Sequence, residues 1–310
     1  QFLILLFFVR KNFKIILNIK VKIDDKIKFF FQKLIPSIFS SGVTQINILV
    51  GTIIASFQAG AVSYLYYADR IYQINLAVAG IAVGTVMLPE LSKHVKNNSD
   101  DLITNLQNRA LELCLFLSIP AGTALVLASE EIVTSLFGYG SFDYESVTNT
   151  AIALTFFAFG VPAFSILKIF SNFFFARNNT KLPFYLSVIS VILNILISVL
   201  FFGKLGFVII PIATSISSWI NVALHFYFIK KQNLHNFDRI FIYKFPRMIF
   251  STVIMGIILY LTLGFFSDKF NYNESWKIVY LFIIVSVNLL IYFFVSSFLG
   301  AFKLKDIKPR

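Results

Sequence analysis

Residues 63–88 read SYLYYADRIYQINLAVAGIAVGTVML, an apolar stretch long enough to cross a bilayer as a helix. An aspartate and an arginine, Asp69 and Arg70, stand side by side near its beginning. An ionisable side chain at such a depth costs about 2.5 to 3.5 kcal/mol on insertion scales, so it usually faces a protein interior or a water-filled cavity. Arg70 is therefore the first candidate for a functional residue.

The composition around this stretch indicates a helical membrane protein. Of the 310 residues, 57% are hydrophobic, 38 are Phe and only 14% are charged. Several uninterrupted apolar runs reach about 20 residues, the length of a transmembrane helix. We predict an all-α membrane protein, a polytopic transmembrane helix bundle with eight complete spans. The predicted spans are residues 36–57, 63–88, 108–128, 150–175, 183–203, 206–229, 245–266 and 277–299.

The N-terminal part of the chain does not form a complete span. Residues 1–9 are apolar but too few to cross a bilayer, and they begin with Gln rather than Met. We interpret them as the end of a truncated transmembrane helix. In residues 10–33 Lys alternates with Ile and Phe, which is typical of a basic amphipathic helix on the cytoplasmic face of the membrane. A solvated linker is the alternative for this segment.

The distribution of Lys and Arg predicts the orientation, because these residues are retained on the cytoplasmic side. When the connections between spans are counted alternately, one side carries 22 of the 27 basic residues. Two more, Arg70 and Lys168, lie within spans, and the other side carries Lys204, Lys269 and Lys277. We therefore predict a multi-pass membrane protein whose residues 10–33 and C-terminus are cytoplasmic.

The net charge of +12 does not by itself indicate a nucleic-acid-binding protein. The basic residues are spread over five short connections without a recognisable nucleic-acid module, and attraction to anionic membrane lipids explains them better. The three histidines lack metal-ligand spacing, and the sequence has neither a nucleophile elbow nor a phosphate-binding glycine loop. We expect no catalysis, no cofactor, no metal site and no nucleic-acid partner.

Four polar side chains at the start of the 63–88 stretch share one helix face. Ser63, Tyr66, Tyr67 and Arg70 follow the i, i+3, i+4, i+7 spacing. We expect this face to line a cavity, where the Arg70 guanidinium presents a fork of donors that matches phosphate or carboxylate oxygens. The alternative is that Asp69 or a carboxylate of another helix neutralises Arg70. Asp69 is a poor partner, because adjacent helix residues point about 100° apart.

Lys168 is the second intramembrane cation, and Ser165 and Asn172 lie on the same face of its helix. It lies roughly 12 Å from the predicted cytoplasmic end, whereas Arg70 lies roughly 10 Å from the outer end of its own helix. One cation nearer each side suits an anionic cargo that is handed across a central cavity. The alternative is that the lysine side chain extends to the cytoplasmic interface.

Several stretches resemble the MurJ/MviN lipid II flippases of the multidrug/oligosaccharidyl-lipid/polysaccharide exporter superfamily. The most specific are Pro36 with GVTQIN at 42–47, IASF at 54–57, residues 63–70 and GIAVGTVMLPELS at 80–92. The later ones are LFGYG at 136–140, Leu167-Lys168, and Phe175–Arg177 with Thr180–Pro183. The resemblance covers nearly the whole chain and places it as the family's spans seven to fourteen.

The resemblance implies a multi-pass flippase of the bacterial inner membrane that moves lipid II, an undecaprenyl-diphosphate-linked peptidoglycan precursor, from the inner to the outer leaflet by alternating access. It implies that residues 34–231 are the second six-helix transporter lobe. Residues 232–310 are then two additional helices and a cytoplasmic tail, and the missing N-terminal lobe of the same protein is a partner. Arg70 and Ser63 match cavity residues of the family. Together with Lys168 they are our candidates for binding the substrate.

Two departures from the family pattern lead to further expectations. Many members have Pro-x-Gly shortly after the arginine, where this chain has residues 75–77 (NLA), so we expect a different local helix geometry. Sodium-binding members have carboxylates at positions that match Gly51 and Ser198 here. Asn194 and Thr214 match the polar partners, but a hard cation prefers charged oxygen ligands, so we expect no sodium site of the family type.

Two other functions are compatible with the sequence. One is another exporter of the same superfamily, for an oligosaccharide-lipid or a cationic drug. A cavity that contains Arg70 and few carboxylates argues against the cationic drug. The other is a transport-inactive, lipid-binding membrane scaffold.

Overall fold

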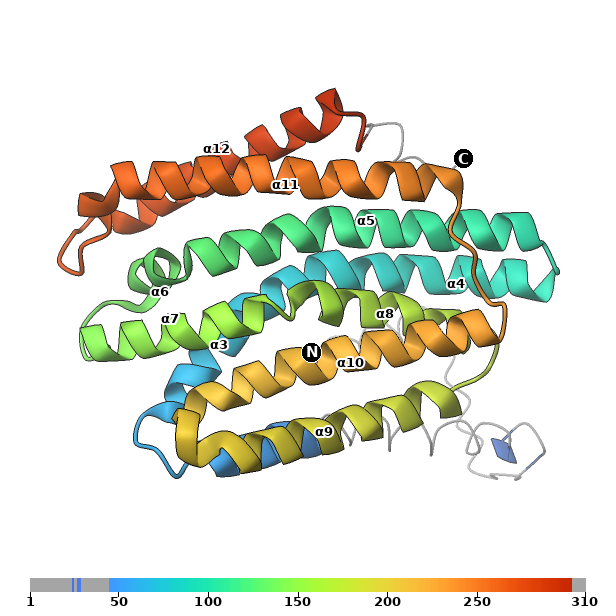
Figure 1. The fold of residues 1–310 in the computed structure, drawn as a ribbon, viewed down its shortest axis with the longest axis horizontal. Helices are drawn as coiled ribbons and strands as arrows, with labels where there is room; N and C mark the ends of the chain where they lie inside the picture. Colours follow the sequence, from blue (N-terminus) through green and yellow to red (C-terminus); the bar gives the residue numbers. More distant parts are fainter. Residues whose placement is uncertain (1–23, 25–26, 29–44, 303–310) are drawn as a thin grey trace, which may run out of the picture.

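The computed structural model describes residues 24, 27–28 and 45–302, in which the regular elements are all helices. The predicted helix end at 1–9, nearly all of the basic segment 10–33 and the tail after residue 302 lie outside the described residues. So does the first part of the predicted span 36–57. Figure 1 shows the described helices running roughly along one common direction.

Most of the described helices belong to long stretches that extend from one end of the bundle to the other (Figure 1). η1 is a π-helix, and η2 and η3 are 3-10 helices. In chain order the elements are Gln45–Ala55, α3 (Ala61–Leu76), η1 (Ala77–Ala82), α4 (Val83–Lys96), α5 (Asp100–Leu127), α6 (Ser129–Phe137), α7 (Tyr144–Ala158), α8 (Val161–Phe175), α9 (Lys181–Leu205), η2 (Gly206–Val208), α10 (Ile209–Lys231), α11 (Arg239–Phe265), η3 (Ser267–Phe270) and α12 (Lys277–Phe298).

The described residues contain five helices long and apolar enough to cross a membrane, or six if the bent pair α7–α8 is one span. The all-helical membrane fold is thus confirmed, but the prediction of eight complete spans is not. One reason is that α7 and α8 are bent by 41° at the break between them, so neither qualifies alone. Another is that Lys181–Lys231 forms a single helical stretch of 51 residues, although two spans were predicted within it.

This 51-residue stretch folds back on itself at Gly206, which has a positive φ of 59°. Glycine adopts this left-handed conformation without the steric penalty of a side chain. Next to it, the backbone N–H of Phe207 donates to Oε1 of Gln58 at 2.8 Å, which ties the turn to the chain before α3. As a result α9 and α10 lie side by side (Figure 1).

A side-chain hydrogen bond joins α9 to α10 within their apolar surroundings, and a second one within α9 continues from it. Asn194 Nδ2 donates to Thr214 Oγ1 at 3.0 Å, and Ser198 Oγ donates to Asn194 Oδ1 at 3.2 Å. Contacts of this kind contribute roughly 0.6–2 kcal/mol between helices in a membrane. Ser198, Asn194 and Thr214 therefore come together as hydrogen-bond partners. Gly51 lies nearby, since a Cβ at that position would be 3.8 Å from Ile210 of α10.

The helix that carries Arg70 runs without a break from Ala61 to Lys96. The middle of this helix, Ala77–Ala82, is a π-helix. It begins at the last of the three residues (75–77) where many members of the resembled flippase family have Pro-x-Gly. A proline would remove a backbone donor and kink the helix, whereas a π-turn accommodates one extra residue and continues. This turn lies against α8, and two glycines allow the approach.

Gly80 and Gly84 are the points where the Ala61–Lys96 helix touches α8. A Cβ at Gly80 would lie only 3.0 Å from the Cα of Ser165. One turn further on, Asn172 Nδ2 donates to the backbone oxygen of Gly84 at 2.8 Å. Small residues of this kind let helix backbones approach closely in membranes, where packing and hydrogen bonds hold helices together.

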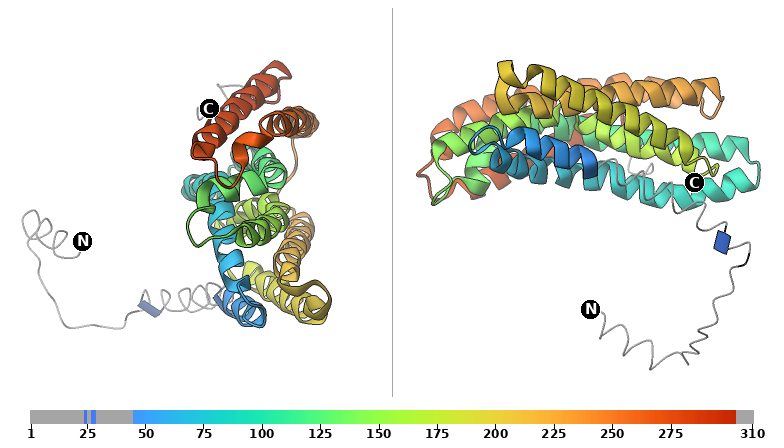
Figure 2. Two further views of the ribbon diagram at one scale, coloured as in Figure 1. Left: turned by 90° about the vertical axis from the view of Figure 1, so that its left-hand side faces the viewer. Right: turned by 90° about the horizontal axis from the view of Figure 1, so that it is seen from below.

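The α11–α12 pair packs along α5, on the side of the bundle opposite α9 (Figure 2). The Tyr292 hydroxyl donates to the backbone oxygen of Phe116 at 2.9 Å, and Tyr292 is buried. Phe302, which follows α12, stacks on the Phe116 ring at a centroid distance of 4.3 Å. Aromatic packing and one backbone-directed hydrogen bond therefore fasten the pair to the middle of α5.

The close contact at Gly80 leads to a stability prediction. Gly80→Ala should lower the thermal stability of the full-length protein, because the new methyl group meets the α8 backbone and overpacking costs about 1–3 kcal/mol. The matched control is Gly203→Ala in α9, where no atom lies within 4 Å of the new Cβ. The stability of Gly203→Ala should be unchanged or higher by up to about 1 kcal/mol, because alanine favours a helix more than glycine does. The measurement is the melting temperature of both variants in the same detergent, and equal values would contradict the prediction.

Candidate functional site

The exposed face of α3 carries three of the four polar residues that were predicted to share it. Ser63, Tyr66 and Arg70 are all exposed. The Arg70 guanidinium lies over the Tyr66 ring, 4.7 Å from its centroid, in a cation–π contact. This contact holds the guanidinium against the helix surface.

The fourth residue, Tyr67, turns away from this face. Its ring packs against Phe137 and Phe142, with centroid distances of 4.7 and 5.1 Å. Tyr67 therefore joins α3 to the turn between α6 and α7 instead of lining a cavity with Arg70.

Asp69 does not form an ion pair with its neighbour Arg70. Its carboxylate accepts a hydrogen bond from Nε2 of Gln73, one turn along α3, and is also hydrogen-bonded to Tyr72. Within residues 45–302 no carboxylate forms an ion pair with Arg70. The Arg70 fork is thus available to an anion that approaches the exposed face of α3.

Lys168 lies on α8 beside the same long helix. Its side chain is exposed, while Ser165 and Asn172, which were predicted to share its face, are buried against the π-turn and the first turn of α4, respectively. The Lys168 stem passes Gly80, where a Cβ would lie 3.5 Å from Lys168 Cγ. Gly80 follows Arg70 by ten residues, or roughly 15 Å of helix rise. The two cations therefore lie beside one helix but at different levels, and the role of each in binding stays a prediction.

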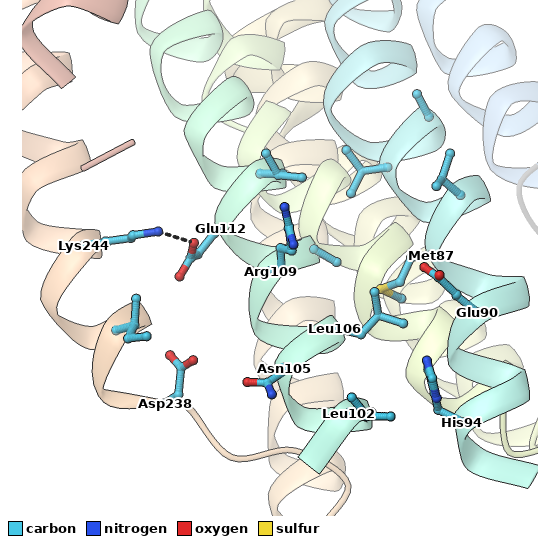
Figure 3. A pocket seen from close by; sticks show the side chains of 16 residues that line it. Met87, Glu90, His94, Leu102, Asn105, Leu106, Arg109, Glu112, Asp238 and Lys244 are labelled. Atoms are coloured by element: carbon cyan, nitrogen blue, oxygen red, sulfur yellow. Dashed lines mark hydrogen bonds and ion pairs between the residues drawn. The ribbon is translucent and has the colours of Figure 1, made fainter. Parts of the chain in front are cut away.

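A cleft of about 570 Å³ opens further along this helix, between α4, α5 and the start of α11 (Figure 3). Ser63, Arg70 and Lys168 do not line it. Its lining is apolar near the π-turn, with Ala82 and Val86, and polar toward the end of α4, with Glu90 and His94. Sequence reasoning missed this cleft. The signal that could have found it is the i, i+4 spacing of Glu90 and His94 on one face of a helix.

An ion pair crosses from α11 to α5 at the edge of the cleft (Figure 3). Lys244 Nζ lies 2.9 Å from Glu112 Oε2, and each side chain is only 12% exposed. Shielding from water makes such a pair stronger than a fully exposed one, although removing the charges from water offsets part of the gain. Asp238 caps α11 nearby by accepting from the backbone N–H of Phe241 at 2.6 Å. The cleft wall is therefore held by polar contacts on the α11 side.

The turn between α10 and α11 is fixed to α5 and α8 by buried polar groups. Asn108 Nδ2 donates to the backbone oxygen of Asn236 at 2.9 Å, and Arg177 Nη2 donates to that of Leu234 at 3.2 Å. His235 is buried, and its Nδ1 lies 3.1 Å from Oε1 of Gln107. Burial lowers the pKa of His235 to about 4, and the positive charges of Lys230 and Arg177 add to this effect.

Comparison with known proteins identifies relatives along most of the chain. The model of the family described as "Lipid II flippase MurJ" matches residues 1–281. The chain is 35% identical over 289 residues to a "Probable lipid II flippase MurJ" of Rhizobium meliloti (strain 1021). The matched region covers 93% of this chain and 54% of that protein. It is 37% identical over 213 residues to the protein of the same description in Rickettsia prowazekii (strain Madrid E), and this match covers 68% of this chain and 42% of that protein. The chain thus spans about half the length of these curated relatives.

Solved structures give a consistent result. A structure described as "Lipid II flippase MurJ, inward closed conformation" is similar with a TM-score of 0.73 and 30% identity, over 91% of this chain and 57% of that one. The MATE multidrug transporter DinF-BH is similar with a TM-score of 0.58 and 16% identity, over 87% of this chain and 63% of that one. At this lower identity the likeness shows a shared fold alone.

The buried His235 leads to a pH-dependent prediction. Its pKa is about 4 in the folded protein against an ordinary 6.5, so the folded state binds fewer protons at this site than the unfolded state. The stability that His235 contributes is therefore complete above about pH 6.5 and is lost as the pH falls toward 4. At pH 5 the loss should reach roughly 2 kcal/mol.

Thermal melting of the detergent-solubilised full-length protein at pH 7.5 and pH 5 checks this. His235→Gln should show a smaller drop in melting temperature between the two pH values than the wild-type protein. His94→Gln, in the cleft, is the matched control and should keep the wild-type drop. An unchanged drop in His235→Gln would contradict the buried neutral state of this histidine.

Proposed function

This chain belongs to the lipid II flippase MurJ family, and we propose that it forms the second lobe and the additional helix pair of a flippase that translocates lipid II. The predicted family is thereby confirmed, and it is a family of membrane transporters, not of enzymes. Because the chain spans about half the length of its relatives, we assign translocation to the whole protein, with the other half as its partner.

We propose eight spans for this part of the protein, with residues 34–231 as the six-helix lobe and 232–310 as the additional pair and tail. The fold-back at Gly206 supports counting α9 and α10 separately. The bend between α7 and α8 supports one broken span. With Gln45–Ala55 as the described end of the first span, the eight are that helix, Ala61–Lys96, α5, α7–α8, α9, α10, α11 and α12.

The proposal that the substrate is a lipid-linked diphosphate rests on Arg70. Its guanidinium lies on an exposed helix face within a membrane span, and within residues 45–302 no carboxylate neutralises it. An arginine fork binds phosphate oxygens in a bidentate manner, and such bonds are strongest where water is excluded. The diphosphate of a lipid-linked sugar supplies this anion within the membrane. We infer that Arg70 holds the diphosphate in the cavity between this lobe and the other half.

The spacing of the three candidate residues gives each a separate role. Ser63 precedes Arg70 by seven residues, or roughly 10 Å, and Lys168 lies roughly 15 Å beyond Arg70 in the other direction. One diphosphate cannot reach both cations at once. We propose that Ser63 hydrogen-bonds the sugar while Arg70 holds the diphosphate, and that Lys168 contacts the anion at another stage of alternating access.

The positions of the connections support the proposed orientation. Figure 1 shows one end of the bundle at which three helices finish and the next three start. The helices α4, α8 and α10 finish there, and α5, α9 and α11 start there. We name it the α4–α5 end. The turns at 138–143, 206–208 and 266–276 lie at the opposite, α6–α7 end. Most basic residues of the connections belong to the α4–α5 end, so we propose that this end is cytoplasmic. Anionic lipid headgroups are the natural partners of these residues.

Cysteine labelling tests the orientation in intact cells. Ser141 and Asn236 are exposed turn residues at opposite ends of the bundle, and the native Cys114 is buried. Ser141→Cys should react with an impermeant thiol reagent, whereas Asn236→Cys should react only after the membrane is permeabilised. The reverse pattern would invert the proposed topology.

Substitution of Arg70 tests the substrate proposal in the full-length protein. Arg70→Lys keeps the charge but loses the bidentate contact, so complementation of a flippase-depleted strain should be impaired. Arg70→Ala should be worse, since an arginine–phosphate contact contributes about 1.5–3 kcal/mol, or roughly 10- to 150-fold in binding. Membrane abundance is measured by immunoblot, and Lys204→Ala at the α6–α7 end is the control cation. Normal growth with Arg70→Ala at normal abundance would exclude the proposed role.

A further inference from the structure

Lys277, the first residue of α12, is a fully buried lysine at the α6–α7 end. Its side chain is 0% exposed, although it stands at the very start of the predicted span 277–299. The Nζ atom donates to the backbone oxygens of Gly138 and Tyr272, both at 2.7 Å. These two carbonyls belong to different turns, so one ammonium group joins both turns to α12.

Two aromatic rings complete the surroundings of this ammonium group. Its Nζ lies 4.0 Å from the Tyr139 ring centroid and 5.0 Å from that of Tyr272. Within residues 45–302 no carboxylate forms an ion pair with Lys277. The partners are therefore carbonyl dipoles and ring faces, which attract a cation and offer acceptors for its N–H groups. A Met or Leu would pack at this position but would bind neither carbonyl.

The contacts of Lys277 continue through the turn between α6 and α7. The Tyr272 hydroxyl donates to the backbone oxygen of Phe142 at 2.8 Å, and Ser135 Oγ donates to the backbone oxygen of Lys277 at 3.4 Å. Figure 2 shows this turn at the same end of the bundle as the start of α12. The residues 135–142 are thereby held between α12 and the rest of the lobe.

The same turn touches the helix that carries Arg70. Phe137 and Phe142 both pack against Tyr67, with centroid distances of 4.7 and 5.1 Å, and Tyr67 is one helical turn from Arg70. A continuous series of contacts therefore leads from the buried ammonium of α12 to the outer turns of α3.

We propose that Lys277 is a positioning residue that fastens the α11–α12 pair to the start of α3, so that both move as one unit when the cavity changes its access. This inference rests on the proposed flippase function. The ammonium acts as a latch, because its removal leaves two backbone oxygens without a donor and breaks the bond from the Lys277 side chain to the turn at 138–142. Arg70 then loses its fixed position relative to the additional pair.

Spin-label distances in the full-length protein test the latch directly. Labels at Val62→Cys and Ile278→Cys, two exposed positions at the starts of α3 and α12, report the distance between these helices in a background with Cys114→Ala. With Lys277 present, we expect one narrow distance distribution with and without substrate. Lys277→Met should broaden that distribution, and the transport rate should fall about tenfold, within the usual range of coupling effects.

Two controls separate positioning from general stability and from failure of the proposed function. Lys269→Met removes an exposed lysine of the same connection, and it should change neither the distance distribution nor transport. Lys277→Ala lacks three carbons and the amine, so added n-propylammonium should restore the narrow distribution, whereas n-propanol should not. Because the distances are measured without transport, they can support the latch even if lipid II is not the substrate.

Three results would overturn the proposal. The first is a distribution in Lys277→Met as narrow as that in Lys269→Met. The second is that transport by Lys277→Met falls only as much as the amount of folded protein falls, while the distances between the spin labels stay unchanged. The third is equal restoration of Lys277→Ala by n-propanol and by n-propylammonium, which would show that volume and not charge is needed.

Discussion

The close contact between the Ala61–Lys96 helix and α8 determines where the candidate residues lie. Gly80 and Gly84 remove the side chains that would separate the two backbones, and Asn172 bonds directly to the Gly84 carbonyl. This contact buries one face of the long helix and leaves the opposite face, with Arg70, exposed. It also places the Lys168 stem beside the π-turn. A bulkier residue at Gly80 would therefore shift both intramembrane cations relative to each other.

Polar contacts attach the α11–α12 pair to the other helices of the bundle at three levels. At the α4–α5 end, Lys244 pairs with Glu112. Midway, the Tyr292 hydroxyl reaches the Phe116 carbonyl. At the α6–α7 end, Lys277 binds two carbonyls of separate turns. Because apolar helices have little hydrophobic reason to associate within lipid, directed contacts of this kind determine which neighbours they have. The pair is thus held along its length, and the Lys277 contact lies nearest the start of the Arg70 helix.

Local properties of the chain predicted much of the fold. The length of each apolar run predicted most helices, because a span must satisfy its backbone groups internally and needs about 20 apolar residues. The number of spans was harder, because the bend between α7 and α8 and the fold-back at Gly206 depend on packing and backbone conformation. Arg70 was also identifiable as a candidate from sequence, since its cost within a span does not depend on the neighbouring helices.

The sequence by itself therefore determined the class of protein, the approximate helices, the family and the two cations within spans. Only the tertiary structure decided which polar side chains share a surface. Ser165, Lys168 and Asn172 follow the same i, i+3, i+7 spacing as Ser63, Tyr66 and Arg70, but Ser165 and Asn172 are buried against glycines of another helix. Lys277 stands at the start of a predicted span, and it is buried because the turn that precedes it and the distant turn after α6 close around it. The physical reason is that periodicity defines a face within one helix, whereas the other helices determine what that face meets.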